Sequence, residues 1–70
     1  MRAFKTWGGA KRYIDTFSSA HRLSIVVVEG TFLVGPTDRG TRIARLDRDG
    51  NHLSTRLLDR VLPESIEAQP

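Results

Sequence analysis

The chain has 70 residues, of which 39% are hydrophobic and 27% are charged, and its formal net charge at pH 7 is +3. This length allows one small domain, and the hydrophobic fraction is too high for an intrinsically disordered chain. The absence of cysteine excludes a disulfide-stapled scaffold and a thiolate metal site.

The N-terminal residues lack the apolar run of a signal peptide, and the longest apolar run, residues 25–28, is too short to cross a bilayer. We therefore expect a soluble, cytoplasmic protein without a membrane partner. Residues 1–60 hold all 11 lysines and arginines, nine of them arginine, against six acids. Arginine suits phosphate and carboxylate contacts, but GC-rich codon usage produces the same bias, so the charge permits nucleic-acid binding without requiring it.

Residues 4–19 predict one amphipathic helix. Thr6 has the chemistry of an N-cap, and apolar side chains then recur at spacings of three and four. The helix is expected to pack Ala10, Ile14 and Phe17 on a sheet. Two glycines in the first turn, Gly8 and Gly9, weaken it by about 1 kcal/mol each relative to alanine.

Residues 23–28 and 31–34 predict a first β-hairpin around a two-residue Glu29-Gly30 turn. This register sets Val27 opposite Phe32 and Val26 opposite Leu33. One face, the expected floor for the helix, carries Leu23, Ile25, Val27, Phe32 and Val34. The reverse face, Val26, Val28 and Leu33, is also apolar, which a sheet with one wet side does not explain. It predicts a cover for that face, either the C-terminal segment or another chain.

Residues 41–48 and 51–57 predict a second hairpin, with Asp49-Gly50 as a type I′ turn. Leu46 then lies opposite Leu53, and the mostly apolar face adds Ala44, Thr55, Arg42 and Leu57. The other face carries Asp47, His52, Arg45, Ser54, Ile43 and Arg56, so Arg45 and Arg56 are expected to face solvent.

Residues 58–62 extend that strand or form one helical turn, and residues 63–70 predict a polar, frayed tail. The expected fold is α+β: one N-terminal amphipathic helix packed on an antiparallel sheet of about four strands, built from two hairpins, with a short C-terminal element. Residues 1–62 form the domain.

Two groups of basic side chains are candidate anion or nucleic-acid sites. The glycine-rich helix start places Trp7 near Lys11 and Arg12, where backbone N–H groups favour an anion; the alternative is a tight turn in which Trp7 packs over the core. The second group is Arg39, Arg42, Arg45, Arg48, Arg56 and Arg60. These arginines either follow a phosphate backbone or form a solvated face neutralised by interleaved aspartates.

No catalytic, cofactor or metal pattern is present. Only two histidines, His21 and His52, occur, and no other histidine or cysteine lies near either. Asp47, Asp49 and Asn51 lack the glycine and glutamate positions of a calcium loop. We therefore expect a protein that is not an enzyme and needs no cofactor or small-molecule substrate.

The preferred hypothesis is a small basic binding or adaptor protein that acts through a protein–protein interface at Val26, Val28 and Leu33, with self-association included. Phage- and plasmid-type accessory proteins that modulate a host protein are often of this size. The alternative is a nucleic-acid-binding protein that uses an arginine-rich sheet face.

Overall fold

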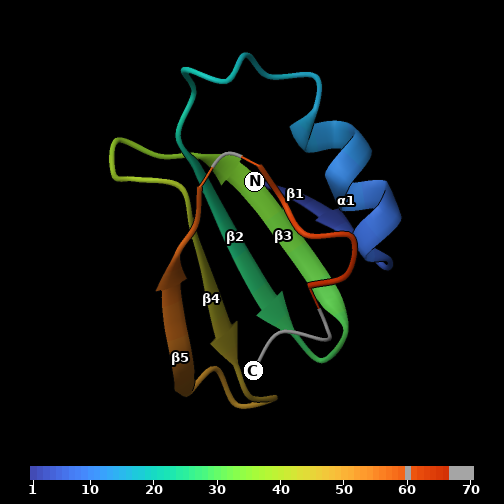
Figure 1. The fold of residues 1–70 in the computed structure, drawn as a ribbon. Helices are drawn as coiled ribbons and strands as arrows, with labels where there is room; N and C mark the ends of the chain where they lie inside the picture. The colour runs from blue at the N-terminus through green and yellow to red at the C-terminus, as the bar shows by residue number, and fades with distance from the viewer. Residues whose placement is uncertain (60, 67–70) are drawn as a thin grey trace.

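The structure, a computed structural model, describes residues 1–59 and 61–66. Its elements in chain order are β1 (Arg2–Phe4), α1 (Trp7–Ile14), β2 (Leu23–Val28), β3 (Thr31–Pro36), β4 (Arg42–Leu46) and β5 (His52–Leu57). The strands form one five-stranded sheet in the order β1-β3-β2-β4-β5, with α1 on one side (Figure 1). The predicted α+β class is confirmed.

The sheet differs from the prediction in strand number and in direction. β1, which the sequence analysis placed outside the sheet, pairs antiparallel with β3 and sets Phe4 beside Phe32. The two hairpins are joined by parallel pairing of β2 with β4, so the sheet is mixed and not antiparallel. Local turn signals define each hairpin, but they carry no information on how two hairpins lie against each other.

The helix α1 is shorter than predicted. Thr6 is the N-cap, as expected, and its hydroxyl accepts a hydrogen bond from the Gly9 N–H at 3.2 Å. The helix ends at Ile14 and not at residue 19, because the Thr16 hydroxyl donates to the Tyr13 carbonyl at 2.6 Å and closes the last turn locally. Phe17 therefore lies beyond the helix and is half-buried, whereas Ala10 and Ile14 are buried as predicted.

The β2–β3 hairpin has the predicted register. Val27 pairs with Phe32 and Val26 with Leu33. The turn has positive φ at both central residues, 48° at Glu29 and 74° at Gly30, as a two-residue type I′ turn requires. β3 continues to Pro36, two residues beyond the predicted strand end.

The loop that connects β3 to β4 crosses the N-terminal end of β2. The Thr37 N–H donates to the Arg22 carbonyl at 3.0 Å, and Arg22 donates to the Asp38 carbonyl at 3.1 Å. Thr41, just before β4, then bonds to the start of β2 and to the residue that follows β5. Its hydroxyl accepts from the Leu23 N–H at 3.4 Å, and its carbonyl accepts from the Leu58 N–H at 2.8 Å. This five-residue loop places β4 parallel to β2, on the side of β2 that is opposite to β3.

The β4–β5 hairpin keeps the predicted register only in part. Arg42, Ile43, Ala44 and Arg45 face the predicted partners on β5, but Leu46 pairs with His52, and not with Leu53. The predicted type I′ turn is wrong, because it requires positive φ at both Asp49 and Gly50. Among the described residues, Glu29 in the other hairpin is the one non-glycine residue with positive φ. At this turn only Gly50 has it, at 83°. The Asp47 N–H donates to the Asn51 carbonyl and the Gly50 N–H to the Asp47 carbonyl, both at 3.0 Å.

These bonds close a three-residue loop with the glycine in the left-handed region, the second common hairpin class. The extra residue is absorbed by a β-bulge next to Leu46. The Asp47 carboxylate selects this loop, because it accepts the N–H groups of Asp49 at 2.9 Å and Asn51 at 2.8 Å.

The hydrophobic core lies between α1, one sheet face and the segment that follows β5. We call this side of the sheet the covered face, and the segment, residues 58–59 and 61–66, the C-terminal segment. The buried apolar side chains are Trp7, Ala10, Ile14, Leu23, Ile25, Val27, Phe32, Val34, Ile43 and Ile66. Figure 1 shows the C-terminal segment returning in front of the sheet towards α1.

Pro63 and Ile66 contact this core, although the sequence analysis assigned both to a frayed tail. The Trp7 Nε1–H donates to the Pro63 carbonyl at 2.9 Å, and Ile66 is fully buried. A single isoleucine in a polar stretch has no local pattern, but it fills the space that the short helix leaves on the covered face. The rest of the predicted tail, residues 67–70, lies outside the described residues.

Candidate functional site

The reverse side of the sheet, which we call the open face, is a continuous apolar surface. β2 contributes Val26 and Val28, and β3 contributes Leu33, all half-buried. Parallel pairing then sets Ala44 beside Val26 and Leu46 beside Val28. The apolar face of the second hairpin is thereby joined to that of the first. The open face further contains Met1, Ala3, Leu57 and Thr55.

The C-terminal segment does not cover the open face. Leu58 and Leu62 pack against the core together with α1, and Val61 points to solvent, with 90% of its surface exposed. The predicted alternative cover for Val26, Val28 and Leu33 is therefore wrong. Within residues 1–59 and 61–66, the helix and the segment after β5 both pack on the covered face, which leaves two large side chains of the open face, Leu57 and Met1, each 76% exposed.

Charge on the open face is confined to Arg42 among the described strand residues. Its neighbours across the strands are Ser24 on β2 and Leu57 on β5. At the opposite end of the sheet, Arg48 forms an exposed ion pair with Glu29 at 3.3 Å. The open face is thus an apolar field with one half-buried arginine near one end.

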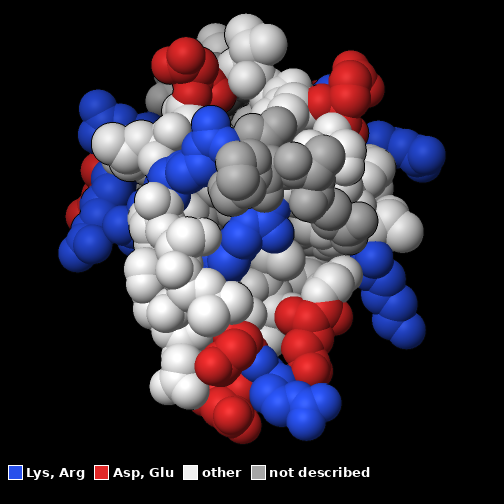
Figure 2. Space-filling model, turned by 60° about the horizontal axis from the view of Figure 1, so that its bottom comes forward, with Lys and Arg blue, Asp and Glu red and all other residues white. Residues whose placement is uncertain are grey.

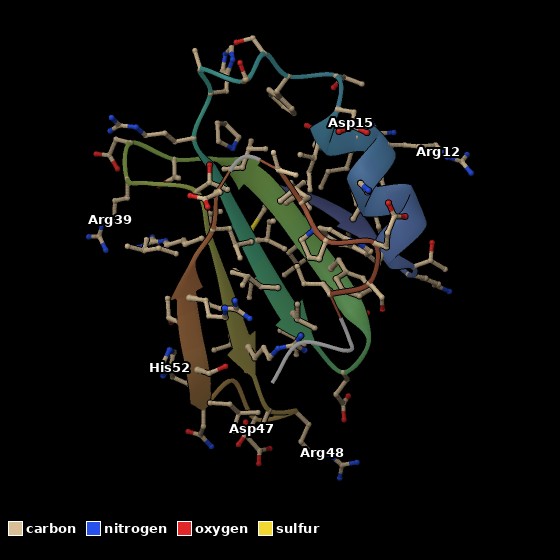
Figure 3. The ribbon with its side chains drawn as sticks, viewed as in Figure 1. Arg12, Asp15, Arg39, Asp47, Arg48 and His52 are labelled. Carbon is tan, nitrogen blue, oxygen red and sulfur yellow. The ribbon has the colours of Figure 1, made fainter. Side chains whose placement is uncertain are left out.

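The bulge in β5 brings a histidine to the open face. In a regular strand, residues three apart point to opposite faces. Here the His52 imidazole Nε2 is hydrogen-bonded to the Thr55 hydroxyl, which is possible because the inserted residue Leu53 reverses the alternation. His52 was predicted on the charged face, together with Asp47, and lies instead at the outer edge of the apolar one (Figure 3).

The arginines predicted to form one face are dispersed. Arg39 and Arg48 lie at opposite ends of the molecule (Figure 3). Arg45 shares a face with Arg56, as predicted, but that face is the covered one, and the Arg45 guanidinium donates to the Ile66 carbonyl. Arg56 lies on the same side and is exposed.

Arg42 is also apart from these residues, because it lies on the open face. Arg60 lies outside the described residues. Figure 2 shows lysine and arginine side chains emerging at separate places around the molecule, with acidic side chains between them. The predicted solvent-facing arginine surface of the second hairpin is therefore wrong. Arg45 does not face open solvent, because the C-terminal segment packs on its side of the sheet and accepts its hydrogen bond at the Ile66 carbonyl.

The glycine-rich helix start has a structural role. Trp7 is buried, with 6% of its surface exposed, and its indole ring lies 5.8 Å from the Phe32 ring. Lys11 lies 3.5 Å from the Glu64 carboxylate, whereas Arg12 points away from the sheet (Figure 3). Trp7, Lys11 and Arg12 therefore do not converge on one point, and the alternative of a tight turn with Trp7 over the core is what the structure shows.

A shallow hollow of about 360 Å³ lies between the end of β5 and the C-terminal segment. It is lined by Arg56, Leu57, Leu58, Asp59, Val61, Leu62 and Pro63. Within the part of the chain that the structure describes, no three histidine or acidic side chains gather where a metal ion would bind. No described helix is long and apolar enough to cross a membrane.

At the β4–β5 turn, hydrogen bonds hold the pKa of Asp47 below the ordinary value of an aspartate. The backbone N–H of Asn51 makes the largest contribution, and the Asn51 side chain and the Asp49 and Gly50 N–H groups add to it. Donors around a carboxylate favour its ionised form. This carboxylate stabilises the turn through its hydrogen bonds to Asp49 and Asn51.

Comparison of the chain with known protein families, with curated proteins and with solved structures finds no match in any of the three. What the arrangement can do must therefore follow from its surfaces. Sequence patterns predicted the apolar faces of both hairpins, but they did not join them. They could not predict that Val26 pairs in parallel with Ala44, because this pairing depends on the path of the loop before β4.

Proposed function

We propose that this chain is a small binding or adaptor protein, without catalytic activity, that holds another protein against the open face of its sheet. The observation that carries the proposal is the continuous apolar field made by Val26, Val28, Leu33, Ala44 and Leu46. Exposed apolar patches of this kind on a small domain mark interaction sites. Among the described residues, α1 and the C-terminal segment both pack on the other side of the sheet, so neither covers this face.

The partner is expected to present an apolar surface with one carboxylate. Arg42 supplies the only charge on the described strands of the open face, and a half-buried guanidinium gains from a bidentate carboxylate partner. The patch would form the desolvated centre of the interface, where binding energy concentrates, and Arg42 would fix the orientation of the partner.

The experiment is a nuclease-treated capture from cell extract, repeated at low and high salt, with four variants of the bait. Leu33→Lys and Arg42→Glu alter the open face, whereas Arg39→Glu and Arg48→Glu alter exposed arginines elsewhere. We expect one captured protein to be retained at high salt by the wild type and by the last two variants, and to be lost from the first two.

Each other outcome contradicts the proposal. Capture that survives Leu33→Lys, with the variant folded by circular dichroism, removes the open face as the site. Capture that disappears with nuclease or falls steeply with salt, together with loss on Arg39→Glu or Arg48→Glu, would favour a phosphate backbone as the ligand, because counterion release makes such binding salt-dependent.

A further inference from the structure

β5 forms one of the two edges of the sheet. β5 ends the sheet, and of its residues only Ser54 is half-buried, whereas the other five are exposed. A free strand edge presents a row of unpaired N–H and C=O groups, to which another strand can add. The opposite edge, β1, is only three residues long and offers little for pairing.

The register shows which groups point outward. The Leu58 N–H donates to the Thr41 carbonyl, so in an antiparallel ladder Arg56 and Ser54 also face β4. The backbone groups of Thr55 and Leu57 then point away from the sheet. Their side chains lie on the open face, because Thr55 pairs with Ala44 and Leu57 with Arg42.

From this geometry we infer that β5 pairs antiparallel with β5 of a second copy of this chain, about a two-fold axis at Thr55. The two outward-facing Thr55 residues would exchange both backbone hydrogen bonds. Leu53 of each copy would lie against Leu57 of the other, which covers two of the most exposed large apolar side chains, at 64% and 76%. Such an isologous contact closes on itself and produces a dimer, not a filament.

The charge on β5 disfavours an axis at Arg56. Arg56 is the only lysine, arginine or acid in the strand. An axis at this residue would oppose two arginines directly, and like charges opposite each other across strands are destabilising. The axis at Thr55 sets Arg56 against the neutral Ser54. The ladder to β4 is regular from Ser54 to Leu57, the stretch that contains the axis.

This inference does not rest on the proposed function, because it uses the strand edge and leaves the faces of Val26, Val28 and Leu33 free. It predicts a ten-stranded sheet in which the two open faces lie on the same side. An axis perpendicular to the sheet is required, since residues opposed in an antiparallel pair share a face. The dimer would therefore present twice the apolar field to a partner.

Sedimentation equilibrium tests the dimer, at concentrations from about 10 µM to about 1 mM, the range in which small interfaces associate. The wild-type mass should rise from 7.9 kDa to twice that value. Leu53→Lys with Leu57→Lys opposes lysines twice across the axis and should weaken association at least tenfold. Leu53→Lys with Leu57→Glu opposes Lys to Glu twice and should restore it.

Both double variants replace exposed side chains, so they are expected to fold, which circular dichroism checks. Thr55→Pro, compared with Thr55→Ala, removes an outward N–H without breaking the β4–β5 ladder and should abolish the dimer. A wild type that stays at 7.9 kDa overturns the inference. So does loss of association in both double variants, which would indicate stacking of the open faces, or its retention in both.

Discussion

The two faces of the sheet are made from similar side chains and used in opposite ways. On β3, Phe32 is fully buried beneath Trp7, while its neighbour Leu33 lies half-buried on the open face. Alternation along a strand assigns each residue to a face, but the layer that packs on the sheet decides which face is core. That layer is thin here: an eight-residue helix and a C-terminal segment that ends in one buried isoleucine.

The largest expected effect comes from the neighbours Phe32 and Leu33. Phe32→Ala should cost about 3–5 kcal/mol, because it leaves a cavity in the covered face, and this is enough to unfold so small a domain. Leu33→Ala should cost below about 1.5 kcal/mol, since its side chain is only half-buried. Urea denaturation of both variants makes the comparison. Equal costs would show that the open face is covered in solution.

The C-terminal segment is tested by Ile66→Ala, with Val61→Ala as the matched control. Ile66 is fully buried and Val61 is 90% exposed. Truncation of a buried isoleucine should cost about 2–5 kcal/mol, whereas the control should change the free energy of unfolding by less than about 0.5 kcal/mol. Thermal melts followed by circular dichroism distinguish them. An unchanged melting temperature for Ile66→Ala would remove the segment from the core.

The turn that sets the register of β5, and hence its faces, depends on Gly50. Gly50→Val should destabilise by about 1–3 kcal/mol, since a β-branched residue resists a φ of 83° although nothing crowds the site. Gly8 has equally open surroundings and an ordinary helical φ, so Gly8→Ala should stabilise by about 0.5–1 kcal/mol. Chemical denaturation of both glycine variants should therefore give shifts of opposite sign.

The smallest expected effect is a pH dependence at the same turn. Because folding lowers the pKa of Asp47, its ionised form stabilises the fold above the ordinary aspartate pKa of about 3.9, and this contribution is lost as pH falls through the lower folded value. Asp47→Asn should be less stable than the wild type at pH 7, with the difference shrinking towards pH 2. Melting temperatures across this range provide the measurement, and a constant difference would contradict the assignment.

Local patterns predicted the elements whose stabilising contacts are close in sequence. The Thr6 cap, the Val27–Phe32 register and the Glu29-Gly30 turn depend on residues within a few positions of one another. The predicted β4–β5 turn was one residue too short, because an Asp-Gly pair fits both a two-residue and a three-residue loop. The Asp47 carboxylate, which accepts two backbone N–H groups, decides between them.

The sequence by itself determined the α+β class, both hairpins and the alternation that makes one face of each apolar. Only the tertiary structure decided that β2 and β4 run parallel and that Ile66 returns to the core, because both depend on contacts between residues far apart in the chain. These two features, the parallel pairing and the buried Ile66, determine where the candidate site lies. The first joins the apolar faces of the hairpins into one surface, and the second commits the C-terminal segment to the other side, so that Val26, Val28 and Leu33 stay open.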